Sequence, residues 1–134
     1  MPARPGQRRR RARPLVILLR SADWPARYQA AMLALTAAAA GDPVHLALFF
    51  DALTAWVEGR FDEGAPPLAA AAKVGSLREA LEEGRRELGL RIVACDTAVR
   101  LAGIDPVRAT AALDRVMGLP ELWSIARAGQ ALAI

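Results

Sequence analysis

A chain of 134 residues, 54% of them hydrophobic and only one a cysteine, has the size of one domain that needs neither disulfides nor metals to fold. No apolar run approaches the roughly 18 residues of a membrane-spanning helix, and one cysteine excludes an internal disulfide and a multi-cysteine zinc site. The formal charge of +4 is uneven: residues 1–14 hold six arginines and no acid, whereas the rest has 12 Lys and Arg against 14 Asp and Glu, a balance of −2.

The arginine-rich segment at residues 1–13 is predicted to be a disordered basic tail, because Pro, Gly and Arg bury too little apolar surface to fold. Two interpretations stay open, an arm that binds polyanions and a leader without a function. Since the domain at residues 14–134 is slightly acidic, nucleic acid is not an expected partner apart from this tail. The tail lacks a signal-peptide pattern, and the lone cysteine favours a reducing compartment, so a cytoplasmic location is expected.

The rest of the chain alternates between short apolar runs and longer alanine-rich or amphipathic segments. Residues 15–19, LVILL, are apolar on both faces, which is typical of a central parallel strand. Ser76 followed by Glu79 is a capping-box pattern that opens a helix, and residues 51–76 before it read as a long connection of the kind that is often mobile and functional. Strands are predicted at residues 15–19, 44–50, 90–94, 115–117 and 131–134, and helices at residues 24–40, 68–73, 76–88, 96–102, 105–113 and 119–126.

This alternation predicts one α/β domain with a mainly parallel sheet of about five strands, flanked by helices. In such sheets, ligands bind at the carboxyl ends of the strands, near a topological switch point. Cys95 directly follows the predicted strand at residues 90–94 and precedes a predicted helix. The fold class therefore places Cys95 at that edge. A helix N-terminus stabilises a thiolate or a persulfide anion, whereas a neighbouring Asp96 carboxylate opposes it. The alternative is that Cys95 is a small buried hydrophobe.

Other candidates for a pocket at this edge follow the same strands. Asp23 and Asp51 come after the first two predicted strands, although either can simply cap a helix. Trp56 can wall a pocket or lie in the core. His45 starts its strand and is expected at the opposite edge from Cys95, which argues against a Cys–His pair. The remaining pocket candidates are Asp96 and Thr97. No metal-ligand cluster and no glycine-rich phosphate loop is present in the sequence, so neither a metal nor another cofactor is expected.

Two runs resemble a known family. Residues 45–51, HLALFFD, and residues 92–104, IVACDTAVRLAGI, together with the order of the predicted elements, are similar to the DsrE/DsrF-like proteins, and most of all to a DsrE-like branch described as peroxiredoxin-like. The likeness covers about residues 15–134. It differs from the branch in the less aromatic segment after Phe50 and in Asp96, which stands where uncharged residues are usual.

The resemblance implies a cytoplasmic three-layer α/β/α domain that assembles as trimers or hexamers. It further implies that Cys95 accepts sulfane sulfur as a persulfide and passes it on, with sulfur-donor and sulfur-acceptor proteins as partners. The expected function is therefore that of a sulfur carrier, similar to a sulfurtransferase. The alternative is a non-catalytic oligomeric scaffold or regulatory domain with an inert cysteine. Surplus apolar surface is a further reason to expect a homo-oligomer, and it is expected at Phe49, Phe50, Trp56 and Trp123.

Overall fold

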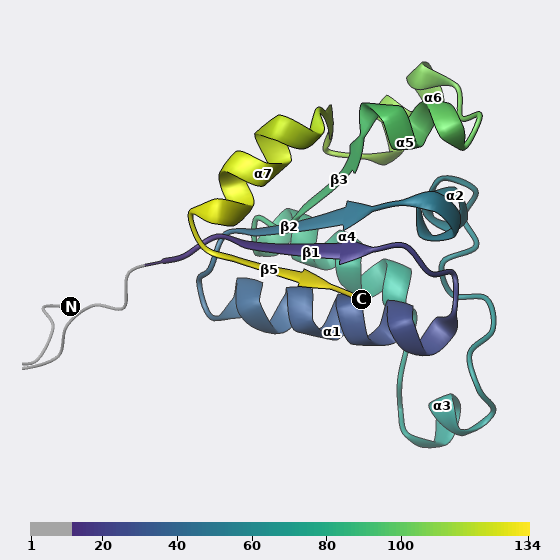
Figure 1. Ribbon diagram of the computed structural model, residues 1–134. Helices are drawn as coiled ribbons and strands as arrows, with labels where there is room; N and C mark the ends of the chain where they lie inside the picture. Colours follow the sequence, from purple (N-terminus) through teal and green to yellow (C-terminus); the bar gives the residue numbers. More distant parts are fainter. Residues whose placement is uncertain (1–11) are drawn as a thin grey trace, which may run out of the picture.

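All five predicted strands are present in the computed structural model, which describes residues 12–134, and they form one parallel sheet with helices on both faces (Figure 1). The predicted α/β class and the three layers are confirmed. The strands are β1 (Leu15–Leu19), β2 (Val44–Leu48), β3 (Arg91–Cys95), β4 (Arg115–Met117) and β5 (Gln130–Ala133). The helices are α1 (Trp24–Ala39), α2 (Phe50–Val57), α3 (Leu68–Ala71), α4 (Leu77–Glu87), α5 (Asp96–Leu101), α6 (Pro106–Ala112) and α7 (Leu119–Arg127).

The order of the strands across the sheet is β4-β3-β2-β1-β5. The chain steps outward from β1 to β4 and then returns past β1 to add β5 on the other side. Because parallel crossovers are right-handed, this reversal puts the returning helix on the opposite face. Accordingly, Figure 1 shows α1 and α4 under the sheet and α7 above it. The topological switch point of the sheet therefore lies between β1 and β5.

Two apolar layers hold the helices to the sheet, because neighbouring strand residues point to opposite faces. Ile17 and Leu46 are register partners, and they belong to the larger core between the sheet and helices α1 and α4. Val16 and Val93 face the other way and pack against α7 in a smaller core. Alternate strand residues thus serve both layers, which explains why the strands read as unbroken apolar runs.

β5 lies close to the start of β1, and Gly129 makes this possible. The Gln130 N–H donates to the Pro14 carbonyl at 3.0 Å. A Cβ atom on Gly129 would lie 1.9 Å from that carbonyl oxygen, so any side chain there would push the two strands apart. Glycine is needed here for close approach of the backbones.

Two predicted details differ from the structure. The strand predicted at residues 44–50 ends at Leu48, and Phe50 already begins α2. The long connection at residues 51–76 is also more ordered than its composition indicates, because it contains α2 and α3 and because Phe61 is fully buried.

Arg27 of α1 explains the order in this connection. Its guanidinium is buried, and it donates to the backbone carbonyls of Arg60, Phe61 and Glu63. Burial lowers the pKa of Arg27, an effect that the nearby Asp62 carboxylate partly offsets. The Ser76 half of the capping box predicted at the start of α4 is present, since the Ser76 hydroxyl accepts from the Glu79 N–H at 3.1 Å.

Among residues 12–134, no helix combines the length and the apolar character needed to cross a bilayer. The predicted basic tail at residues 1–13 falls outside the described residues, except for Ala12 and Arg13.

Candidate functional site

Cys95 is the last residue of β3 and the residue that precedes α5. The sequence places it there because the apolar run of β3 ends where Asp96 begins a helical turn. Its side chain packs in the larger core beside Ala98 and Val99, and 7% of the residue is exposed to solvent. The thiol is thus free of disulfides and nearly covered, with a small exposed part at the carboxyl edge of the sheet.

The carboxylate of Asp96 is the nearest charged group to the thiol. The Cys95 sulfur lies 3.7 Å from Asp96 Oδ1, to which the thiol can donate. The same oxygen accepts from the Thr97 backbone N–H at 2.8 Å and caps the first turn of α5. Thr97 in turn accepts from Arg100 at 3.1 Å. Cys95, Asp96 and Thr97 therefore form one bonded group, in which a negative charge stands beside the sulfur.

The other pocket candidates are not bonded to this group. Asp23 precedes α1 and Asp51 lies in the first turn of α2, so both lie at the carboxyl edge, after β1 and β2. The Trp56 side chain is fully buried, and its Nε1–H donates to the Ala112 carbonyl at 2.8 Å. Trp56 is therefore a core residue that joins α2 to α6, and the expectation that it adds to the apolar surface is wrong.

His45 lies at the opposite end of the sheet from Cys95. It is the second residue of β2 and the register partner of Arg91, four residues before Cys95 on β3. At about 3.3 Å per residue, the two positions are roughly 13 Å apart along the strands. The structure thus agrees with the sequence in separating Cys95 from the histidine.

A small cavity of about 290 Å³ surrounds His45, lined also by Arg91, Asp114 and Arg115. Burial lowers the pKa of His45, and the positive charges of Arg91 and Arg115 lower it further, while Asp114 and Glu121 act in the opposite direction. His45 is therefore a largely neutral imidazole near neutral pH. Within residues 12–134, no group of three or more His, Cys, Asp or Glu side chains is arranged to hold a metal ion.

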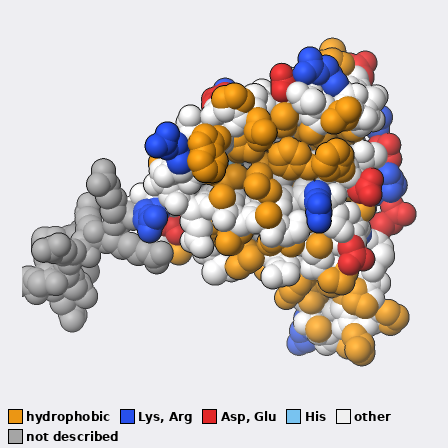
Figure 2. All heavy atoms as spheres, in the orientation of Figure 1, with side chains coloured by type: hydrophobic (Ala, Val, Ile, Leu, Met, Phe, Trp, Pro, Cys, Tyr) orange, Lys and Arg blue, Asp and Glu red, His pale blue; other side chains and the backbone are white. Residues whose placement is uncertain are grey.

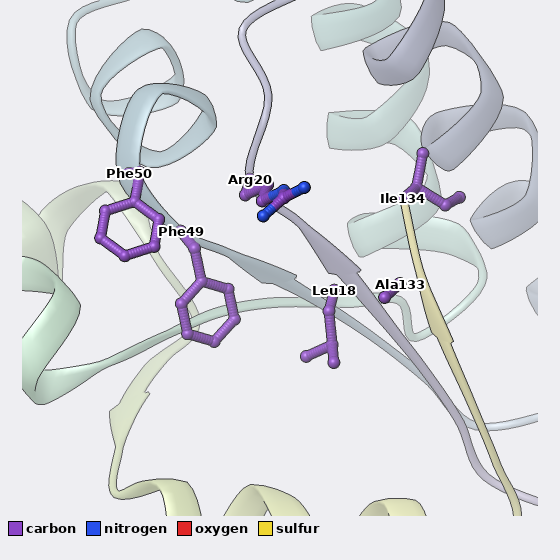
Figure 3. Close-up of a pocket in the computed structure, with 6 residues that line it drawn as sticks. All are labelled: Leu18, Arg20, Phe49, Phe50, Ala133 and Ile134. Carbon is purple, nitrogen blue, oxygen red and sulfur yellow. The ribbon is translucent and has the colours of Figure 1, made fainter.

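The cavity at the topological switch point was not predicted from the sequence. It has a volume of about 430 Å³, and its walls come from the carboxyl ends of β1, β2 and β5, as Figure 3 shows. β3 is two strands away from β1, so at about 4.8 Å per strand Cys95 is roughly 10 Å to the side. The available signal was Arg20, which directly follows the first strand. The lining residues are Leu18, Arg20, Phe49, Phe50, Ala133 and Ile134.

The fold and the site define an α/β domain with an all-parallel five-stranded sheet and a nearly covered cysteine at its carboxyl edge. No protein-family model matches the chain, and no curated protein matches its sequence.

Proposed function

We propose that the protein is a cytoplasmic sulfur carrier that accepts sulfane sulfur on Cys95 as a persulfide and passes it to another thiol. The supporting observation is the position of the single cysteine, between the carboxyl end of β3 and the first turn of α5. Parallel sheets bind ligands at this edge, and backbone N–H groups of a first helical turn favour a sulfur anion. The resemblance of residues 92–104 to DsrE-like proteins supports the same chemistry.

The transfer needs only thiol chemistry. The Cys95 thiolate attacks the outer sulfur of a donor persulfide, a new S–S bond forms on Cys95, and the S–S bond of the donor breaks. The donor sulfur leaves with the electron pair as a thiolate. This donor thiolate then takes up the proton that the Cys95 thiol gave up. An acceptor thiolate then attacks the outer sulfur of the Cys95 persulfide in the same way. The rate depends on access to the sulfur and on its thiolate fraction.

Asp96 places a negative charge beside the Cys95 sulfur. Its carboxylate accepts from the thiol and repels a thiolate, because the sulfur and the oxygen are 3.7 Å apart. At that distance, a unit charge in water is worth about 1 kcal/mol and more where water is partly excluded. We therefore infer a carrier that reacts with a bound donor protein more readily than with free oxidants.

The partners proposed are a sulfur donor, a sulfur acceptor and further copies of this chain in a trimer or hexamer. The support for self-association is an apolar surface that Figure 2 shows as a band across the face formed by α7 and the carboxyl edge of the sheet. Trp123 is 63% exposed and Phe50 54% exposed, whereas Phe49 is half-buried. Light scattering at micromolar concentration is expected to give the mass of several chains, and the mass of one chain would contradict this part of the proposal.

Intact-mass spectrometry after treatment with a small persulfide donor tests the function. The wild type is expected to gain one sulfur that a thiol reductant removes. The matched control is Cys95→Ser, which replaces the only cysteine by a side chain of nearly the same size. No gain in the wild type, or an equal gain in the variant, would refute the proposed role of Cys95.

The second candidate is a non-catalytic oligomeric scaffold or regulatory domain in which Cys95 is inert. One observation favours it, since a residue that is only 7% exposed and packed in the core behaves as a small hydrophobe. In that case, Cys95→Ala would leave the oligomeric mass unchanged, and the native thiol would react only when the domain unfolds.

A further inference from the structure

The cavity at the switch point combines apolar walls with one positive charge. In Figure 3, Arg20 lies between the pair Phe49 and Phe50 on one side and Ile134 on the other, with Leu18 below it in this view. Leu18, Phe49 and Phe50 contribute hydrocarbon, and Arg20 is the only charged side chain of the lining. Such a combination suits a ligand with an apolar body and one negative charge.

The charge of Arg20 is not used by the described part of the chain. The ion pairs among residues 12–134 involve Arg60, Arg78, Arg85 and Arg115. Arg20 is exposed, and its guanidinium forms neither an ion pair nor a hydrogen bond with a described residue. A cation that faces an apolar cavity without a partner can receive an anion at little cost, because no internal bond has to break.

Phe50 is held at the cavity in an unusual conformation. Its φ is +48°, a left-handed conformation that is a genuine outlier for a bulky residue. The strain arises because β2 ends at Leu48 and α2 begins at Phe50 with only Phe49 between them, so the chain turns sharply at the rim of the cavity. As a result, the ring stays 54% exposed above the space that Phe49 and Leu18 enclose.

We propose that this cavity binds a small organic carboxylate whose body is an aromatic ring or a short acyl chain. The apolar part would lie against Leu18, Phe49 and Phe50, and the carboxylate would pair with Arg20, whose planar fork matches carboxylate geometry. A volume of about 430 Å³ lies in the range of small-molecule sites. The location follows the rule for open parallel sheets, in which the crevice at the switch point receives the ligand. The site does not depend on Cys95 chemistry.

Chemical-shift titration of the folded chain tests the proposal with three probes. 3-Phenylpropionate supplies both the ring and the charge, 3-phenylpropionamide keeps the ring without the charge, and acetate keeps the charge without the ring. The carboxylate is expected to saturate and to shift the amide signals around Leu18, Arg20 and Phe50. The amide is expected to bind about fivefold to tenfold more weakly, and acetate is expected not to saturate.

Matched variants assign the binding to the cavity. Arg20→Gln is expected to reduce the affinity for 3-phenylpropionate to that of the amide, and it should leave the affinity for the amide unchanged. Arg108→Gln removes an exposed charge on α6 outside the cavity lining and should have no effect. Cys95→Ser should bind like the wild type, which separates this site from the proposed sulfur chemistry.

Three outcomes would overturn the proposal. These are equal affinities for the carboxylate and the amide, equal losses in Arg20→Gln and Arg108→Gln, and the absence of any saturable binding. The last outcome includes the case in which another copy of the chain covers the cavity.

Discussion

The Cys95 side chain is subject to two opposed influences from its own neighbours. The first turn of α5 presents backbone N–H groups that favour a sulfur anion, and the Asp96 carboxylate presents a negative charge 3.7 Å from the sulfur. α5 has only six residues, so its dipole is small. We therefore expect the negative charge of Asp96 to slow the reaction of Cys95 with thiol reagents.

Replacing Asp96 by Asn tests this balance. The amide oxygen can still accept from the Thr97 N–H and cap α5, but the charge is gone. The rate at which a small uncharged maleimide labels Cys95 at neutral pH is expected to rise about fivefold, which corresponds to roughly 1 kcal/mol. Thr97→Val keeps the Asp96 carboxylate and serves as the control. An unchanged rate in Asp96→Asn would show that burial alone limits the thiol.

His45 is the only histidine in the chain, so its titration can be separated from that of the carboxyl groups. Burial, followed by the charges of Arg91 and Arg115, lowers its pKa in the folded state, while the unfolded chain keeps the usual value of about 6.5. As the pH falls below about 6.5, the unfolded chain takes up the proton first. Stability should therefore fall with decreasing pH, from about pH 6.5 down to the lower pKa of the folded state.

The variant His45→Leu measures this contribution. Urea unfolding from pH 7.5 to pH 5 is expected to show a falling free energy of unfolding in the wild type and a flatter profile in the variant. Any loss of stability that both proteins share does not come from His45. Parallel profiles above pH 5 would contradict the assigned pKa direction.

At the scale of the elements, the two tryptophans of α2 and α7 have opposite roles. Trp56 is fully buried, its ring meets Phe61 edge-on with centroids 5.3 Å apart, and the Arg78 guanidinium lies 4.5 Å above it. Trp123 of α7 is 63% exposed. Both are large apolar side chains in helices of similar length, and only the packing of the whole fold distinguishes them.

Alanine substitutions should reveal this difference. Trp56→Ala is expected to lower the free energy of unfolding by about 3–5 kcal/mol, the usual cost of deleting a buried aromatic side chain. Trp123→Ala is expected to change it by less than about 0.5 kcal/mol in a dilute sample. Urea unfolding followed by circular dichroism measures both. Similar losses in the two variants would contradict the placement of Trp56 in the core and of Trp123 on the surface.

The elements themselves were largely predictable, because strands that are buried on both faces read as apolar runs and helix ends carry glycine, proline or a capping box. The boundary between β2 and α2 was not predictable. Phe49 and Phe50 have high strand propensity, and the turn at Phe50 is imposed by tertiary packing. The role of Arg27 was also hidden. An arginine in an alanine-rich helix reads as a solvated charge, and its three carbonyl partners lie more than 30 residues away.

At the scale of the whole molecule, the order of the strands decides where ligands can bind. Local sequence placed the ends of β1, β2 and β3 at one edge, and this part of the site prediction needed no structure. The position of β5 beside β1 depends on the return through α7 and on close approach at Gly129, neither of which has a local signature. For that reason the switch-point cavity, and Arg20 in it, could not be found from the sequence.

The two proposed sites therefore use different parts of one edge. Cys95 lies at the end of β3, and the cavity lies at the ends of β1, β2 and β5, so that β2 stands between Cys95 and Arg20. A sulfur carrier with a separate small-molecule site could link transfer to ligand binding. The proposed sulfur transfer depends on Cys95, which must react while the domain stays folded.

The reaction of Cys95 with an aromatic disulfide, followed at increasing but non-denaturing urea concentrations, tests this claim most directly. A sulfur carrier is expected to react at a rate well above that of global unfolding and nearly independent of urea, because reaction requires only a local opening at the end of β3. A rate equal to that of global unfolding, rising with urea as steeply as unfolding does, would contradict the proposed role of Cys95 and leave it as an inert core residue.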